Sequence, residues 1–334
     1  MKTHYINPLV LDPRSFPLVR PSITCIDNEV YFGSYPIAQV SNLESNFLKE
    51  CTGRFNLADA ASRAGVDSTC VTLCANWLLW WGSKVSAAPL SRPVDRLVIS
   101  ATHTGAWLGM GGRILLEAER HRTAVITCSG SLGQTMFVEP FPTLAEVSMA
   151  GRDEAAFVAR LSGVQQRVLD FPDYSLRELL QHSGRTASED VPDALRTKLL
   201  ELIAEYQPSQ IFAPAALGTC ADSRMLFETL LSLFAEGEIE GELHLFEDEP
   251  AIHGHRNVDE FLSSFEGSYL TPHEYYVDVS APFPEKLSLT DAFRCTIDKR
   301  TANAWSQSAE RNAVLSGSTA TRAERFWELN LTSI

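Results

Sequence analysis

Three side chains of this sequence could together perform nucleophilic catalysis. Cys220 and Asp222 stand two residues apart in the stretch CADS, and His103 lies in the stretch SATHTGA. A cysteine becomes a nucleophile when a neighbouring base takes its proton, and a third group can orient that base. We therefore consider Cys220 as a nucleophile, His103 as its base and Asp222 as the orienting carboxylate. The alternative is that Cys220 is a tolerated small residue and His103 a hydrogen-bonded loop histidine.

These residues follow segments that predict parallel β-strands. The strand candidates are DRLVIS, TAVITC, QRVLDF, SQIFAP, ELHLFE and YYVDVS. They alternate with helix candidates around 109–121, 144–162, 192–206, 222–235, 256–265 and 284–303. This alternation is typical of a mostly parallel sheet covered by helices on both faces. Because ligands bind beyond the carboxyl ends of such strands, the loops after the first and fourth strands are expected to meet at one crevice.

The first part of the chain predicts a smaller, separate unit. SKVSAAPLSRP contains two prolines and lacks the periodicity of its flanks, so it predicts a linker. Before it, NEVYFGSYP predicts a hairpin, and short helices are expected around 42–51, 57–64 and 68–81. Ser41 and Glu44 have the spacing of a capping box, which predicts a helix start. We expect a first domain over 1–84, a linker over 85–93 and a second domain over 94–334.

Composition excludes several classes of protein. With 45% hydrophobic and 21% charged residues, the chain is typical of soluble globular proteins. A net charge of -14 argues against a nucleic-acid binder, because a phosphate backbone needs a basic face. Neither a membrane span nor a signal peptide is evident, so we expect a cytoplasmic protein that contacts no membrane. The seven cysteines lack CxxC spacing and predict neither a disulfide framework nor a zinc ribbon.

A hairpin and two short helices are predicted together in one stretch of the first domain. This stretch is DNEVYFGSYPIAQVSNLESNFLKECTGRFNLADAASRAGV, in which the first helix ends in a C-x-G turn. It resembles the PqqD-like and winged-helix peptide-recognition domains of natural-product biosynthesis. Such domains bind a peptide as an added strand at a sheet edge. The resemblance implies a peptide or protein partner for residues 22–84, whereas the alternative is a small cap that binds nothing else.

A series of short stretches runs in order through the second domain. They are VIS with LGMGG, TCSGS, GRDEAAFVARLSGV with VLDFPD, IFAP with CADSR, LFEDEP, VDVS, EKLSLTDAF, WSQSAER and AERFWEL. In these stretches the chain resembles, from about Arg96 to Trp327, the PIG-L or LmbE-like family of metal-dependent deacetylases. The resemblance implies a Rossmann-like three-layer α/β/α domain, here preceded by a small winged-helix-like α+β domain. It also implies a role in bacterial natural-product biosynthesis.

The first zinc-binding loop of that family has a different sequence here. The family reads Pro-His-Pro-Asp-Asp-Glu, in which the His and the second Asp bind zinc and the first Asp is the general base. Counting back from the intact glycines of LGMGG, the two ligand positions fall on Thr102 and Gly105. The position of the base falls on Thr104. The glycine-rich LGMGG itself predicts a turn between strand and helix.

The second family signature, His-Pro-Asp-His, is also replaced. It falls on Cys220, Ala221, Asp222 and Ser223, so that Ser223 occupies the position of the third zinc ligand. Hydroxyl groups and glycine are poor substitutes for the imidazole and carboxylate donors that a hydrolytic zinc site needs. We therefore expect neither the familial zinc site nor any other cofactor.

The remaining residues of this crevice are candidates for substrate binding. Arg152 matches a family helix that supports the site, and His253 lies in AIHGHRN, which lines the pocket entrance in the family. A metal held instead by Cys220, His103 and Asp222 would need a local insertion that the LGMGG spacing does not show. The substrate-binding candidates are Thr102, Thr104, Gly105, Ser223, Arg152 and His253.

Three functional classes follow. As an enzyme, the protein would be an amide (C–N) hydrolase or acyl-transfer enzyme acting on a small amide or amine, or on a carrier- or peptide-bound substrate, without the familial zinc. As a non-catalytic protein, it would be an accessory or scaffold subunit that holds a peptide or a partner enzyme. The third class is a metal-dependent N-deacylase with rearranged ligands. Metal content and the effect of Cys220→Ala distinguish them.

Overall fold

The chain divides into two compact units, which are described separately. In the computed structural model the first unit is Met1–Ala87 and the second is Ala88–Ile334. The structure describes residues 16–19, 23–32, 35–52, 55–66, 79–82, 93–131, 144–182, 191–248, 258–290, 293 and 299–331. His253 and most of the predicted linker lie outside these residues. Within them, no helix has the length and apolar composition needed to span a bilayer.

The first unit contains two small antiparallel sheets and two described helices. Its elements are β1 (Phe16–Val19), β2 (Ile23–Ile26), β3 (Glu29–Phe32), β4 (Tyr35–Gln39), α1 (Asn42–Glu50), α2 (Leu57–Ala64) and β5 (Leu79–Gly82). β2, β3 and β4 form one sheet, so the predicted hairpin is confirmed as β3 and β4. β1 pairs with β5. The helix predicted over 68–81 is therefore wrong at its end, where adjacent tryptophans favour the extended backbone of β5.

The predicted start of α1 is confirmed by its capping box. Ser41 Oγ accepts a hydrogen bond from the Glu44 N–H at 3.2 Å, and the Glu44 carboxylate accepts one from the Ser41 N–H at 2.7 Å. The turn before β3 uses Asp27 and Asn28 at φ 49° and 65°, a backbone region that these two residue types tolerate. Local sequence thus determines the turns and the helix start of this unit. Its assignment as a PqqD-like or winged-helix domain stays a prediction.

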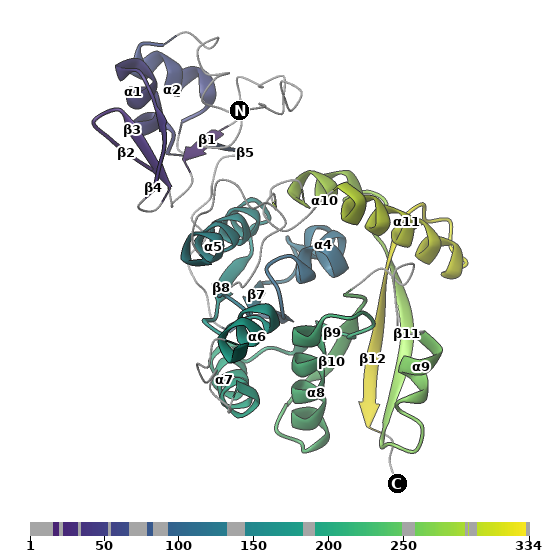
Figure 1. The fold of residues 1–334 in the computed structure, drawn as a ribbon. Coiled ribbons are helices and arrows are strands. Elements are labelled where there is room, and N and C mark those ends of the chain that lie inside the picture. Colours follow the sequence, from purple (N-terminus) through teal and green to yellow (C-terminus); the bar gives the residue numbers. More distant parts are fainter. Residues whose placement is uncertain are drawn as a thin grey trace. The chain divides into compact units, whose positions relative to one another are not determined.

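A seven-stranded sheet forms the middle of the second unit (Figure 1). Its strands are β6 (Arg96–Ser100), β7 (Thr123–Thr127), β8 (Gln165–Val168), β9 (Gln210–Pro214), β10 (Glu242–Phe246), β11 (Leu270–Asp278) and β12 (Ala323–Leu331), in the order β11-β12-β10-β9-β6-β7-β8. The strands from β6 to β10 pair in parallel, which confirms the predicted sheet. β12 runs antiparallel to both of its neighbours.

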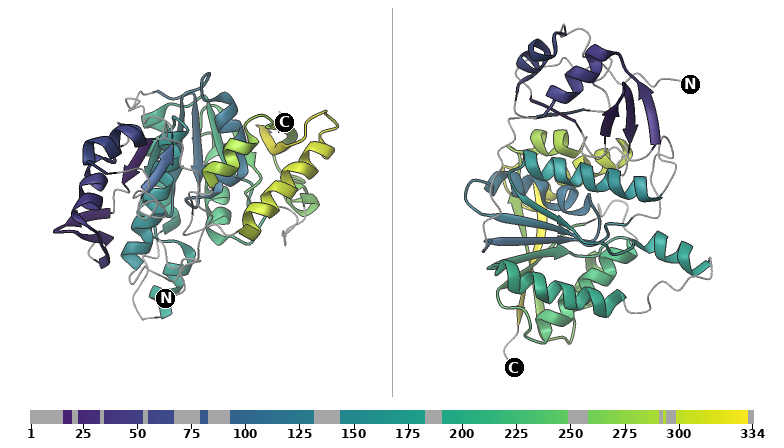
Figure 2. Two further views of the ribbon diagram at one scale, coloured as in Figure 1. Left: turned by 90° about the horizontal axis from the view of Figure 1, so that it is seen from above. Right: turned by 90° about the vertical axis from the view of Figure 1, so that its left-hand side faces the viewer.

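Helices cover both faces of this sheet, as Figures 1 and 2 show for the second unit. The helices are α4 (Gly105–Glu117), α5 (Leu144–Leu161), α6 (Tyr174–His182), α7 (Val191–Tyr206), α8 (Ala221–Ala235), α9 (Val258–Ser263), α10 (Phe283–Thr290) and α11 (Lys299–Leu315). Side chains of β6 alternate between two apolar cores. Leu97 and Ile99 pack with residues of α7 and α8, whereas Val98 packs with residues of α4 and α5. The Rossmann-like three-layer architecture is therefore confirmed.

The glycines of LGMGG lie inside α4, so the turn predicted there is wrong. The helix already begins at Gly105, and it is kinked at Met110, whose φ is -136°. A Cβ at Gly109 would lie 2.5 Å from the Glu247 carbonyl oxygen, and a Cβ at Gly112 would lie 2.8 Å from Val279 Cβ. These glycines serve close packing of the helix on the sheet rather than a turn.

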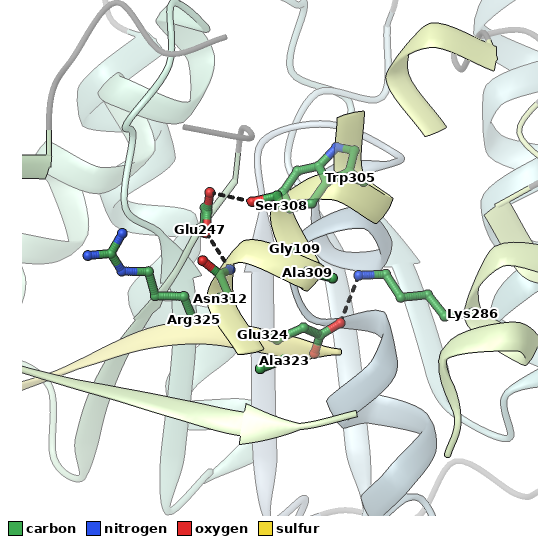
Figure 3. A pocket seen from close by; sticks show the side chains of 10 residues that line it. All are labelled: Gly109, Glu247, Lys286, Trp305, Ser308, Ala309, Asn312, Ala323, Glu324 and Arg325. Carbon is green, nitrogen blue, oxygen red and sulfur yellow. Dashed lines mark hydrogen bonds and ion pairs between the residues drawn. The ribbon is translucent and has the colours of Figure 1, made fainter. Parts of the chain in front are cut away.

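A buried ion pair satisfies the backbone groups that the kink releases (Figure 3). The Glu324 carboxylate accepts hydrogen bonds from the N–H groups of Gly112 and Arg113, each at 2.8 Å, and from Lys286 Nζ at 2.8 Å. Lys286 also donates to the Leu108 carbonyl oxygen. Unpaired backbone groups are costly in a protein interior. The pair therefore connects β12 and α10 to the middle of α4.

A second buried carboxylate connects the end of β10 to α11, next to this pair (Figure 3). Glu247 accepts hydrogen bonds from Ser308 Oγ at 3.0 Å, Arg311 Nη2 at 3.1 Å and Asn312 Nδ2 at 2.9 Å. These hydrogen bonds offset the free-energy cost of removing the Glu247 carboxylate from water. Its role is structural, and it holds the backbone against which Gly109 packs.

We expect Gly112→Ala to destabilise the protein by about 1–3 kcal/mol, because its Cβ would overlap Val279. Gly111→Ala is the matched control, since its Cβ would lie 3.5 Å from the nearest atom, on Lys286, in ordinary contact. Urea denaturation followed by tryptophan fluorescence measures both free energies of unfolding. Equal effects of the two substitutions would contradict the packing role of Gly112.

Candidate functional site

The loop between β6 and α4 is closed by its own hydrogen bonds. Ser100 Oγ donates to the Thr102 carbonyl oxygen at 2.9 Å and accepts from the Ala106 N–H at 3.1 Å. Thr102 Oγ1 accepts from the Gly105 N–H at 3.2 Å. A Cβ at Gly105 would lie 2.6 Å from Ser100 Oγ. The hydroxyls thus cap the first turn of α4, and position 105 has no room for a side chain.

His103 lies in this loop, buried and without a hydrogen-bond partner. Its side chain is 2% exposed, and neither ring nitrogen has a partner. Burial, and secondarily the charge of Arg152, lowers the pKa of His103 to about 4, so the imidazole is neutral at pH 7. A buried polar group without a partner is rare and needs an explanation, such as a ligand that binds it.

Arg152 extends from α5 to the segments that follow β7 and β8. Its Nε donates to the Gly130 carbonyl oxygen at 3.2 Å, and its guanidinium forms an ion pair with Asp170 at the end of β8. The Asp170 side chain is 82% exposed, so this ion pair is screened by water and weak. The positive charge of Arg152 helps to lower the pKa of His103. Its role in substrate binding stays a prediction.

Asp222, in the first turn of α8, is bound by two groups of α6. Its Oδ2 accepts a hydrogen bond from the Tyr174 N–H at 2.9 Å, and its Oδ1 lies 2.8 Å from Arg177 Nη2. The Asp222 residue is 5% exposed. A buried carboxylate needs a countercharge, and Arg177 supplies it here. The sequence did not indicate Arg177, because the helix α6 was not predicted; the apolar spacing in YSLRELLQH was the available signal.

Cys220 caps α8 and is not activated as a nucleophile. Burial raises the pKa of its thiol, and the charges of Asp222 and Asp248 add to this, although a hydrogen bond with Ser223 opposes it. A thiolate forms readily only where cations or a base lower the thiol pKa. Cys128, at the end of β7, is more strongly affected, since burial raises its pKa to about 12. Both thiols are protonated at neutral pH.

The structure brings together some of the predicted site residues and separates others. Cys220, Asp222 and Ser223 share the first turn of α8. Thr102, His103, Thr104 and Gly105 form the loop into α4, and Thr104 is its N-cap residue. Within the described part of the chain, no hydrogen bond joins His103 to Cys220 or Asp222, because both ring nitrogens lack partners. The catalytic roles of these three groups stay a prediction.

The residues that the resemblance assigns to the zinc positions offer poor zinc donors. The Thr102 hydroxyl is engaged by the Gly105 N–H, Gly105 offers no side chain, and Ser223 is hydrogen-bonded to Cys220. Zinc in proteins is held by imidazole, thiolate or carboxylate groups. Across the residues that the structure describes, no three such side chains gather into a metal-binding group.

The second unit has the Rossmann-like fold of LmbE-like deacetylases. The zinc-inhibited teicoplanin deacetylase Orf2 is 17% identical with a TM-score of 0.51, over 71% of this chain and 98% of its own. The N,N'-diacetylchitobiose deacetylase of Pyrococcus horikoshii is 17% identical with a TM-score of 0.50, over 70% of this chain and 84% of its own. The 4-carboxy-2-hydroxymuconate hydratase GalB of Pseudomonas putida is 18% identical with a TM-score of 0.51, over 72% and 97%.

At this identity, the similarity establishes the fold alone. No protein-family model matches the chain, and no curated protein matches it in sequence. Proteins of one fold differ in chemistry, which resides in particular side chains. The function is therefore argued below from the residues at the strand ends.

The stability of the protein should depend on pH through His103. Its pKa is about 4 when folded and 6.5 when exposed, so the unfolded chain binds the proton first as the pH falls. The contribution of the neutral His103 to the free energy of unfolding is fully present above pH 6.5 and is lost as the pH falls toward 4. Between pH 7 and pH 5 the free energy of unfolding should fall by about 2 kcal/mol. Denaturation of His103→Leu should show a pH dependence smaller by this amount. His182→Gln, at an exposed site, should keep the pH dependence of the unmodified protein. Identical pH profiles of stability for His103→Leu and the unmodified protein would refute the burial of a neutral imidazole.

The closure of the loop at Gly105 can be tested by a double-mutant cycle. We expect Gly105→Ala to cost about 1–3 kcal/mol, because its Cβ overlaps Ser100 Oγ. In a Ser100→Ala background the nearest remaining atom is Thr102 Oγ1 at 3.2 Å, so the cost should fall by at least half. Denaturation of the four proteins measures the coupling, and strictly additive effects would show that Ser100 does not close this position.

Proposed function

We propose that the second unit binds a small amide or amine, free or attached to a carrier or peptide, without the zinc of LmbE-like deacetylases. The observation that carries this proposal is the hydroxyl-capped loop after β6. The resemblance assigns Thr102 and Gly105 to the positions of two zinc ligands. The Thr102 hydroxyl is bonded to the Gly105 N–H, and a side chain at Gly105 would overlap Ser100. The site would lie at the carboxyl ends of β6 and β9, the general place for ligands in such sheets.

The charge balance of the strand ends supports an uncharged or weakly charged ligand group. Arg177 already balances Asp222, and Asp170 balances Arg152. His103 is neutral and has a donor and an acceptor nitrogen available for a ligand. An amide, which also carries one donor and one acceptor, suits such a group. Among the residues that the structure describes, the metal-dependent alternative lacks the donor set it would need.

Structural neighbours favour a role in natural-product biosynthesis. Besides teicoplanin deacetylase, they include the A40926 pseudoaglycone deacetylase Dbv21, 16% identical with a TM-score of 0.50, over 73% of this chain and 100% of its own. Both names denote enzymes that act on antimicrobial natural products. We extend only the ligand class to this chain, as an amide- or amine-bearing molecule. A non-catalytic role as a ligand-binding accessory subunit agrees best with the raised pKa of the Cys220 thiol and with the lack of a hydrogen bond from His103 to it.

The first unit would hold the partner or the carrier peptide. Among the described strands, the outer strands β2 and β4 of the sheet β2-β3-β4 each pair on one side only. An extended peptide can add to such an edge through backbone hydrogen bonds. Residues 22–84 would in this way deliver a peptide-bound ligand to the second unit, or recruit a partner enzyme to it.

Metal analysis and ligand titration test this function. Elemental analysis of the purified protein should find zinc well below one atom per chain, and a chelator should not change binding of an amino sugar or its N-acetyl form in calorimetry. His103→Ala should weaken that binding about tenfold, the loss of a hydrogen bond to a buried group. His182→Ala, on the exposed end of α6, is the control.

Stoichiometric zinc would overturn the metal-free proposal. Turnover of the amide that disappears in Cys220→Ala would instead establish covalent catalysis by this thiol. Binding that is the same in His103→Ala and in the unmodified protein would move the ligand away from this loop.

A further inference from the structure

Helix α6 is attached to the carboxyl end of the sheet through Asp222, and among the described residues it contributes no side chain to either apolar core. Its side chains are exposed or half-buried, and none is fully buried. It starts directly after the segment that follows β8 (Figure 1). Tyr174 is 45% exposed and Leu179 is 51% exposed. An isolated helix of this length is marginal in water, and most helices gain their stability from an apolar face packed on a core. Other contacts must therefore hold α6 in its place.

The start of α6 is attached to the first turn of α8 by one carboxylate. Asp222 receives the Tyr174 N–H at 2.9 Å and lies 2.8 Å from Arg177 Nη2. Arg177 also donates to the Pro172 carbonyl oxygen at 2.8 Å, and Asp173 caps the helix by accepting from the Leu176 N–H at 2.7 Å. The last two bonds are local, whereas the bonds to Asp222 connect α6 to a distant part of the chain.

The proposed site is closed to solvent in this arrangement. The two ring nitrogens of His103 and Asp222 Oδ1 are buried without an aligned hydrogen-bond partner among the described residues. A ligand can reach such atoms only if an element moves. The helices α4, α5 and α8 bury apolar side chains in the two cores, and their displacement would expose them to water. α6 can move at the smallest cost.

We propose that α6 is a lid over the site and that the Arg177–Asp222 ion pair is its latch. The residues Tyr174–His182 swing away when the pair separates, and this exposes the first turn of α8, including Cys220. Segments with few buried contacts open locally while the rest of the molecule stays folded. The site that the lid covers is the one in the proposed function, but the latch itself can be tested without any ligand.

Hydrogen–deuterium exchange of the full chain tests the latch. In Arg177→Met the amides of α6 should exchange at least about tenfold faster than in the unmodified protein, whereas those of β6 and β9 should not change. Arg177→Lys keeps the charge and should restore most of the protection. Arg196→Met is the matched control, because Arg196 on α7 pairs at the surface with Glu236.

Thiol labelling provides a second readout. Cys220 should react several-fold faster with a maleimide in Arg177→Met, since opening of α6 uncovers it. Cys51, buried in the first unit, is the internal reference and should keep its rate. Peptide mapping assigns each labelled thiol. Asp222→Asn removes the other half of the latch and should give the same pattern in both measurements.

Two results would overturn the proposal. One is unchanged exchange of α6 together with unchanged labelling of Cys220 in both latch variants. The other is faster exchange of β6 and β9 along with α6, which would make the helix an integral part of the folded body. Either result would leave metal-free ligand binding intact, because zinc content and ligand titration test that separately.

Discussion

The close approach of α4 to the sheet is the constraint on which the second unit depends. Gly109 and Gly112 have no side chain, so the helix can lie against the end of β10 and the segment after β11. This contact kinks the helix at Met110 and releases backbone groups in the interior. The buried pair Lys286–Glu324 satisfies them and joins the C-terminal elements to α4. The start of α4, with its loop, is thereby fixed at the strand ends.

The electrostatic properties of the site at the strand ends depend on which charged side chains lie there and on how they are paired. Hydroxyl groups accept the first N–H groups of α4, and Asp222 takes its countercharge from Arg177 on a neighbouring helix. An arginine moves with the helix that carries it, so α6 is coupled to Asp222.

Much of the fold could be predicted from local pattern. Apolar runs such as RLVIS and TAVIT indicated the parallel strands, and Ser41 with Glu44 indicated the start of α1. β12 was not recognised as a strand, because it buries Glu324 and Arg325 among its apolar residues, which obscures the pattern. Residues 79–81 were assigned to the end of a predicted helix, because their pairing partner β1 lies far away in the sequence. The partner of Asp222 was missed for the same reason.

The sequence alone determined the alternation of strands and helices, the mostly parallel sheet and the start of α1. These properties depend on residue type and local spacing. Tertiary structure decided that α4 begins at Gly105, before the LGMGG glycines, that His103 is buried without a hydrogen-bond partner, and that Asp222 is bound to Arg177. Each of these depends on segments distant in the chain, whose contacts no local pattern encodes.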